Sequence, residues 1–132
     1  ARTLRTAAFD ASTLDISAFR YGAGDLGDTT AVPVVRPGQP LTFRNLEGDA
    51  SRRAYHTITS CAAPCTGSAG IAYPLADGKV DFDSGQLGFG PAGFTAAVNR
   101  DTWSTPRDLP SGTYTYFCRV HPFMRGAFKV AG

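Results

Sequence analysis

Short runs of alternating apolar and polar residues, separated by turn-forming Gly and Pro, recur along most of this chain. They cover residues 14–21, 31–35, 41–46, 55–59, 101–105, 112–118 and 126–131. A period of two is typical of β-strands that bury one face, and the sequence shows no convincing helical periodicity. About seven short strands of this kind predict an all-β domain, either a β-sandwich or a small barrel.

The length of the chain suits one domain of ordinary size. It has 132 residues, of which 42% are hydrophobic, enough for one packed core. The formal net charge of +2 is too small to indicate a nucleic-acid partner. No segment approaches the roughly 20 apolar residues that a membrane-spanning helix needs. We therefore expect a single domain over residues 1–132, with no transmembrane segment in this chain.

The stretch from 61 to 99 differs in character from the rest. It is rich in Gly, Pro and Ala and contains the turn-laden pieces "DGKVDFDSG" and "GFGPAGF". A loop of this length inside a compact domain is usually functional or covers a surface. We interpret it as a loop-rich insertion that either simply caps one end of the domain or covers or extends a functional surface, with room for one short strand at "KVDFDSG".

The three cysteines divide into a close pair and a single residue. "CAAPC" places Cys61 and Cys65 around a proline, which favours a disulfide across a tight turn. Half of a zinc site is the alternative, but the chain lacks a second pair of cysteines to complete it. A disulfide implies an oxidising compartment, so we expect a bacterial protein exported to the periplasm or the exterior. Cys118 is left without a partner and needs its own explanation.

The segment "YFCRVHPFM" places three scarce residue types in one loop at the end of a strand. Cys118, His121 and the chain's only methionine, Met124, follow one another at intervals of three. Taken singly, a cysteine is more often a small buried residue, a histidine a surface or hydrogen-bonded residue, and a methionine part of the hydrophobic core. Taken together, thiolate, imidazole and thioether are the donors of an electron-transfer copper site, which needs one more imidazole. The only other histidine is His56, and it can complete the set if its strand lies beside that of Cys118.

Two other chemistries use these residues less completely. A catalytic pair of Cys118 and His121 would need a third group to orient it and would leave Met124 without a role. Zinc would gain little from a thioether and would prefer another fourth ligand. We therefore predict one copper ion per chain and no catalytic residue.

At these positions the sequence resembles the cupredoxins, the small type 1 (blue) copper proteins. "CRVHPFMRG" has the spacing of the ligand loop in the amicyanin-like members, and "HTI" resembles the motif of the first histidine ligand. "ISAFRYGAG", "VRPGQPLTFRN" and "LPSGTYTYFC" resemble framework strands of plastocyanin-like domains.

The resemblance implies a Greek-key β-sandwich of about eight strands that transfers single electrons through a copper ion cycling between Cu(I) and Cu(II). His56, Cys118 and His121 would be equatorial ligands and Met124 the axial one. The electron-transfer surface would consist of His121, Pro122 and Phe123. The chain would not itself be an enzyme, because its four ligands leave no open position on the metal.

Two residues next to the ligands depart from the family pattern. Thr57 occupies a position where relatives often have an asparagine that ties the ligand loops together. Val120 replaces a proline before the loop histidine, so it retains an amide that can donate a hydrogen bond to the sulfur of Cys118. We expect this donor to stabilise Cu(I) and to raise the reduction potential.

Four arginines near the candidate ligands indicate what kind of redox partner the protein could bind. Arg52, Arg53, Arg119 and Arg125 lie close to the ligands in sequence and form either a basic rim or four solvated side chains. A rim would steer a redox partner with an acidic docking face. We expect a monomer. The alternatives to electron transfer are a copper carrier and the electron-inlet domain of a larger copper enzyme.

Overall fold

The fold is taken from a computed structural model, which describes residues 7–10, 12–22, 25–26, 31–49, 54–61, 81–89, 100–121 and 123–132. Within these ranges the chain forms eight strands. They are β1 (Ala7–Asp10), β2 (Thr13–Ile16), β3 (Ala31–Val35), β4 (Thr42–Asn45), β5 (Thr59–Cys61), β6 (Thr102–Ser104), β7 (Gly112–Phe117) and β8 (Arg125–Val130).

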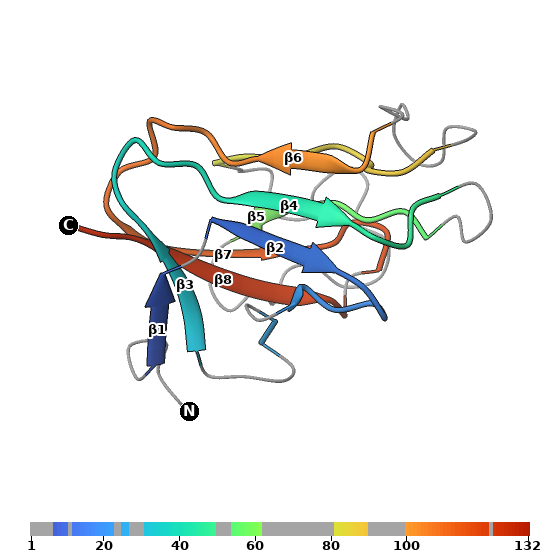
Figure 1. The fold of residues 1–132 in the computed structure, drawn as a ribbon, viewed down its shortest axis with the longest axis horizontal. Helices are drawn as coiled ribbons and strands as arrows, with labels where there is room; N and C mark the ends of the chain where they lie inside the picture. The colour runs from blue at the N-terminus through green and yellow to red at the C-terminus, as the bar shows by residue number, and fades with distance from the viewer. Residues whose placement is uncertain are drawn as a thin grey trace.

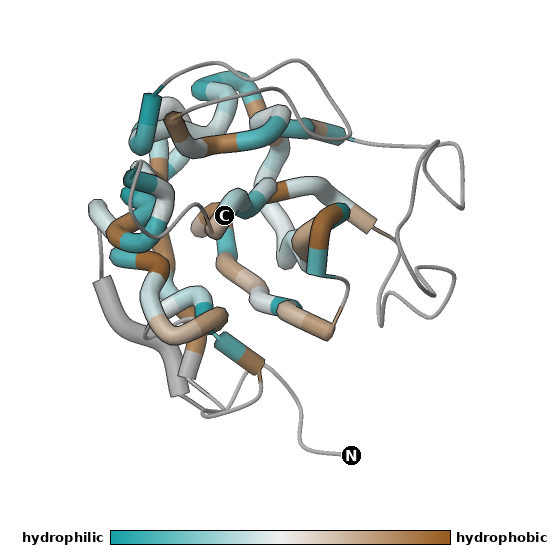
Figure 2. The backbone as a smooth tube through the Cα atoms, turned by 90° about the vertical axis from the view of Figure 1, so that its right-hand side faces the viewer, coloured by the Kyte–Doolittle hydropathy of each residue, from teal (hydrophilic) through white to brown (hydrophobic). Residues whose placement is uncertain are grey.

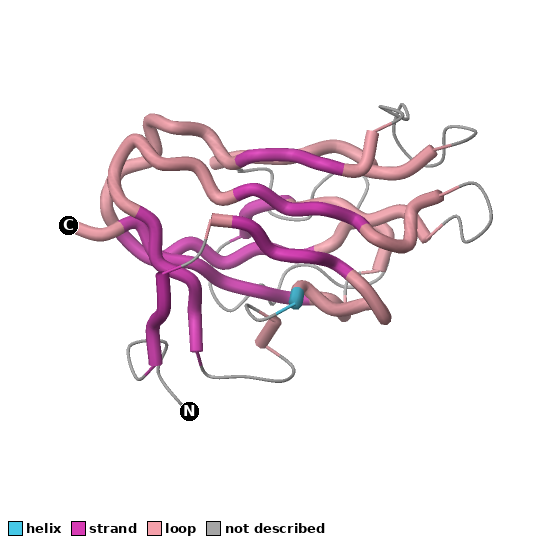
Figure 3. The backbone as a smooth tube through the Cα atoms, viewed as in Figure 1, coloured by secondary structure: helices cyan, strands magenta, loops and turns pink. Residues whose placement is uncertain are grey.

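The strands form two sheets that pack into a sandwich. One sheet has the order β1-β3-β8-β7-β5 and the other has the order β2-β4-β6. From β1 to β7 the chain alternates between the sheets, so the pairs β1–β3 and β2–β4 are parallel, whereas β7 and β8 form an antiparallel hairpin. Parallel neighbours cannot be joined by a tight turn, which explains the crossovers. The two layers are visible in Figure 1, and Figure 3 shows strands and loops almost throughout. This confirms the predicted all-β sandwich.

The core lies between the sheets and is largely aromatic. The ring of Tyr116 on β7 lies 4.7 Å from that of Tyr21 and 5.3 Å from that of Phe43, measured between centroids. Hydrophobic and hydrophilic residues are interspersed along the backbone (Figure 2). On β4, for example, Phe43 and Asn45 are buried while Arg44 is exposed. The largest fully buried side chains are Tyr21, Tyr116, Phe43, Phe117, Phe128, Ile16, Leu41, Ile58, Leu87, Met124, His56 and Gln86.

Several predicted strands have different bounds in the structure. The run 31–35 is a strand over its full length, whereas the run 14–21 forms a strand only as far as Ile16. Residues 17–20 then form a tight turn. The prediction for 55–59 was wrong in its placement, because the strand begins at Thr59. Residues 81–89 make isolated bridges and no regular strand, and β1 was not predicted.

One end of the sandwich gathers the segments that carry the candidate ligands. β2, β4 and β7 all point toward the right-hand end of Figure 1, and the C-terminus lies at the opposite end. β5 pairs antiparallel with β7, with Thr59 opposite Phe117, so the residues before β5 lie beside the residues after β7. In the part of the chain that the structure describes, no helix has the length and hydropathy needed to cross a membrane.

Candidate metal centre

Three of the predicted ligands converge at this end of the sandwich. One nitrogen from each of His56 and His121 and the sulfur of Cys118 all lie within 4.8 Å of one another. Nδ1 of His56 is 3.8 Å from the Cys118 sulfur, although the two residues are 62 positions apart, and Nδ1 of His121 is 3.9 Å from it. Both imidazoles therefore present the same ring nitrogen to the thiol.

The ligand loop is closed by its own backbone. The amide of Met124 donates to the carbonyl of His121 over 2.9 Å, and the amide of Cys118 donates to the carbonyl of Met124 over 3.2 Å. β7 ends at Phe117 and β8 begins at Arg125, so all three loop ligands lie in one short connection. Met124 is buried and belongs to the same core cluster as Cys118.

His56 is held by backbone hydrogen bonds to a segment of the insertion. The amide of His56 donates to the carbonyl of Leu87 over 3.3 Å, and the amide of Leu87 donates back over 2.8 Å. The insertion also reaches the ligand loop through an ion pair between Asp83 and Arg119. The described part of the insertion therefore supports both ligand segments, which is a more specific role than the predicted cap.

Burial sets the protonation of the donors. Burial lowers the pKa of His56 to about 4, against the raising effect of Glu47. Burial also lowers the pKa of His121, so both imidazoles are favoured in the neutral form that binds metals. Burial raises the pKa of the Cys118 thiol, while backbone hydrogen bonds from Thr57, His121 and Val120 lower it in part. A bound cation would be needed to hold this sulfur as a thiolate.

Thr57 and Val120 both face the sulfur through their backbones. The Thr57 amide donates to the Cys118 sulfur over 3.4 Å, and the His121 amide does so over 3.3 Å. The Thr57 hydroxyl oxygen accepts the amide of Arg119 over 2.9 Å. Thr57 therefore joins the two ligand segments directly. The Val120 amide is among the groups that lower the pKa of the Cys118 thiol and so favour the thiolate.

The donor geometry suits a metal ion. Using typical bond lengths for a bound thiolate and imidazole, a trigonal site would separate sulfur and nitrogen by about 3.8 Å. The observed separations of 3.8 and 3.9 Å agree with this. Two neutral imidazoles and one sulfur, with a methionine in the same loop, are the donor chemistry of a type 1 copper site.

Two residues at the site were not singled out from the sequence. The carboxylate of Glu47 lies 2.6 Å from Nε2 of His56, on the side of the ring that faces away from Cys118. The ring of Phe19 meets the rings of His56 and His121 edge to face, with centroids 5.5 and 5.0 Å apart. A glutamate in a turn and a phenylalanine after a strand are common, so neither residue type indicated a role at the site.

Some predicted features lie outside the described residues. Pro122, Arg52 and Arg53 are among them, so only His121 and Phe123 of the predicted electron-transfer surface belong to the described residues. The charge of Arg119 is matched by Asp83, which leaves less for a basic rim. Cys118 is a free, buried cysteine. Cys65 is also outside the described ranges, and the Cys61–Cys65 disulfide stays a prediction.

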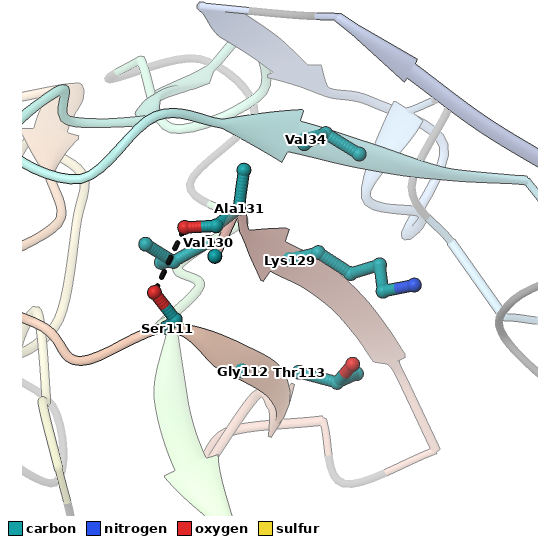
Figure 4. Close-up of a pocket in the computed structure, with 8 residues that line it drawn as sticks. Val34, Ser111, Gly112, Thr113, Lys129, Val130 and Ala131 are labelled. Atoms are coloured by element: carbon teal, nitrogen blue, oxygen red, sulfur yellow. Dashed lines mark hydrogen bonds between the residues drawn. The ribbon is translucent and has the colours of Figure 1, made fainter.

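A shallow pocket of about 480 Å³ lies at the other end of the sandwich (Figure 4). Its wall includes Val34 on β3, Thr113 near the start of β7 and Lys129 near the end of β8. None of the convergent donor residues lines it. The pocket is therefore separate from the candidate metal centre.

Comparisons with known proteins give matches among solved structures alone. No protein-family model matches the sequence, and no curated protein matches it. Among solved structures, the reduced state of an amicyanin mutant is 21% identical over 97% of this chain and 89% of its own, with a TM-score of 0.53. A purple cupredoxin from Nitrosopumilus maritimus is 18% identical over 92% of this chain and 100% of its own, with a TM-score of 0.50.

A copper-containing nitrite reductase from Thermus scotoductus also matches. It is 18% identical over 91% of this chain but only 22% of its own, with a TM-score of 0.52. At these identities the likeness concerns the fold, and it confirms the predicted cupredoxin fold.

Proposed function

We propose that this chain, which has the cupredoxin fold, is a one-electron carrier built around a single type 1 copper ion. His56, Cys118, His121 and Met124 would hold the ion. The observation that carries the proposal is the convergence of the two imidazole nitrogens and the sulfur within 4.8 Å. When bound, copper supplies the change between Cu(I) and Cu(II) that moves one electron.

The protein's part is to hold the donors in one arrangement. His56 is tied to Leu87 by two backbone hydrogen bonds, and the ligand loop is closed between Cys118 and Met124. His56 and Cys118 are fully buried, so water has little access to them. A site with little freedom to rearrange favours rapid electron transfer, because ligands need not move between oxidation states.

We propose that electrons enter and leave at His121. This imidazole is half-buried, and Phe123 beside it is 70% exposed, with ring centroids 6.0 Å apart. Phe19, 41% exposed, contacts both rings. An exposed apolar patch around a ligand edge is suited to brief docking with a redox partner.

The first test is copper loading followed by absorption and electron paramagnetic resonance spectroscopy. The proposal predicts intense visible absorption from thiolate-to-copper charge transfer, and its loss in Cys118→Ala. Phe123→Ser should slow electron exchange with a redox partner and leave the absorption unchanged. A wild-type protein that binds only Cu(I) and stays colourless would instead support copper carriage.

A second candidate function is the electron inlet of a larger copper enzyme. The match that covers 22% of a nitrite reductase chain favours this function. The two functions share the same centre and differ in the partner. Electron exchange with a separate protein would support the carrier, whereas exchange only within a longer chain would support the inlet domain.

Partner and compartment are also proposals. We propose export to the periplasm or the exterior, a Cys61–Cys65 disulfide and a monomeric state. The partner would be a redox protein with an acidic docking face. Thiol titration of the unfolded, unreduced protein should then find one free thiol, Cys118, and added salt should slow electron exchange. Three free thiols, or a rate independent of salt, would contradict these proposals.

A further inference from the structure

Glu47 is surrounded by hydrogen-bond donors. Its Oε2 lies 2.6 Å from Nε2 of His56 and accepts the Phe19 amide over 2.9 Å. Its Oε1 accepts the Ala18 amide over 3.0 Å. The side chain is only 10% exposed. An ionised carboxylate has only acceptors, so it satisfies all three donors without a proton of its own.

This contact determines the tautomer of His56. Because the carboxylate only accepts, Nε2 of His56 must carry the hydrogen that it donates to Glu47. A neutral imidazole carries one hydrogen, so Nδ1 is left with its lone pair free. Nδ1 is the nitrogen that lies 3.8 Å from the Cys118 sulfur. The contact therefore prepares the correct atom for the metal.

The same carboxylate holds a strained turn. Ser17 and Arg20 exchange backbone hydrogen bonds, and the two residues between them, Ala18 and Phe19, have φ angles of 50° and 59°. Such angles are unfavourable for residues other than glycine, and Asn-Gly is usual in a turn of this kind. The turn places the Phe19 ring against both imidazoles. Both of its strained amides donate to Glu47.

Glu47 is itself fixed by its neighbours. The Glu47 amide donates to the side-chain oxygen of Asn45 over 3.0 Å, and the side-chain nitrogen of Asn45 donates to the carbonyls of Ala54 and Leu87. Asn45 thus connects the Glu47 segment to Ala54, two residues before His56, and to Leu87, the backbone partner of His56. The position of the carboxylate is set by the fold before any metal binds.

We propose that Glu47 is a positioning residue of the metal centre. It fixes His56 in the tautomer that presents Nδ1, and it holds the 17–20 turn that places Phe19 over the two histidines. The inference rests on the proposed copper site for its effect on the metal, but its effect on the tautomer belongs to the metal-free protein.

The charge of Glu47 also acts on the metal through the ring. A carboxylate bonded to the far nitrogen makes a ligand imidazole a stronger donor, and its negative charge favours Cu(II) over Cu(I). The Glu47 side chain therefore lowers the reduction potential of the copper. This effect is opposite in sign to that of the amides that donate to the Cys118 sulfur.

Two variants separate the charge from the hydrogen bonds. In Glu47→Gln the side-chain oxygen can take the place of Oε2 and keep the bonds to His56 and Phe19, while the charge is lost, together with the bond from the Ala18 amide, which the NH2 group cannot accept. Glu47→Ala loses the charge and all of these bonds. Asp108→Asn is the matched control, because it removes one carboxylate charge from an exposed position in the connection between β6 and β7.

The first readout is the tautomer of His56 in the metal-free protein, measured by nitrogen-15 NMR. We expect hydrogen on Nε2 in the wild type, in Glu47→Gln and in the control, and a mixed population in Glu47→Ala. The wild type carrying hydrogen on Nδ1, or Glu47→Ala retaining the Nε2 form unchanged, would overturn the proposal. If Glu47→Ala does not fold, the wild-type tautomer and Glu47→Gln still decide it.

The second readout uses the copper-loaded protein. We expect a higher reduction potential in Glu47→Gln and a Cu(II) affinity about 10–100-fold weaker in Glu47→Ala, with no change in the control. If the reduction potential and the Cu(II) affinity of both variants equal those of the control, the proposed effect of Glu47 on the copper is wrong. A wild type that shows no thiolate-to-copper absorption would instead refute the proposed function, and the tautomer measurement would remain decisive for Glu47.

Discussion

Replacing Thr57 by valine tests how the two ligand-bearing segments are joined. Thr57 is fully buried, and its hydroxyl oxygen accepts the amide of Arg119 over 2.9 Å. Valine has nearly the same shape but cannot accept a hydrogen bond. Thr57→Val also removes the bond between the hydroxyls of Thr57 and Thr59, 2.9 Å long, but the Thr59 hydroxyl would keep its bond to Asp83. The main loss is therefore the acceptor for Arg119. The Thr57 amide would still donate to the Cys118 sulfur.

The expected cost follows from that lost acceptor. Removing one partner of a buried hydrogen bond costs about 1–3 kcal/mol. For 132 residues the entropy of unfolding is about 0.28 kcal/mol/K, from about 2.1 cal/mol/K per residue. The melting temperature should therefore fall by about 4–11 °C.

The assay is thermal unfolding of the metal-free protein, followed by circular dichroism. Thr113→Val makes the same chemical change at an exposed position on β7, where we expect a change within about 0.5 kcal/mol. Equal melting temperatures for the two variants would refute the reasoning, because the Thr57 hydroxyl would then contribute no more than a surface one.

Three further predictions concern the centre and its support. Val120→Pro removes an amide that favours the Cys118 thiolate, so voltammetry should find a lower reduction potential, and a higher one would count against the argument. Gly48→Ala would place a Cβ 2.6 Å from the Asn45 side-chain nitrogen and should cost about 1–3 kcal/mol of stability in urea unfolding. Gly132→Ala, whose Cβ would meet nothing closer than 3.8 Å, should be neutral, and a similar loss in both would refute the clash. Removing copper should lower the melting temperature, because copper at a free concentration 100 times its dissociation constant would stabilise the folded protein by about 2.7 kcal/mol. An unchanged melting temperature would argue against a copper site in the folded protein.

The convergence of the candidate ligands could be predicted because it depends on few and mostly local features. Cys118, His121 and Met124 lie in one loop, so their spacing alone limits the chemistry. His56 could be predicted as the second imidazole ligand because the chain has no other histidine besides His121. Its strand was nevertheless placed wrongly, because His56 pairs with Leu87 from the insertion and the ladder with β7 begins only at Thr59. Pairing with a distant segment leaves no periodic signal in the sequence.

Glu47 and Phe19 could not be predicted because their roles arise only in the folded chain. Phe19 lies over the histidines because Ala18 and Phe19 adopt left-handed angles, which neither residue type favours. Glu47 stabilises that turn and contacts His56 from a different connection, the one after β4. Two segments with no local signal thus depend on each other, and only the packing of the sandwich brings them together.

The proposed copper centre would combine two opposing influences that act on different ligands. Amides of Thr57, His121 and Val120 would withdraw charge from the Cys118 sulfur and favour Cu(I), whereas Glu47 would act through His56 and favour Cu(II). Glu47→Gln should raise the reduction potential, Val120→Pro should lower it, and the double variant should lie between the two single variants. Voltammetry of all four proteins forms a double-mutant cycle. A double variant outside the interval set by the single variants would mean that one substitution rearranges the other ligand, and the separate action of Glu47 and Val120 would have to be abandoned.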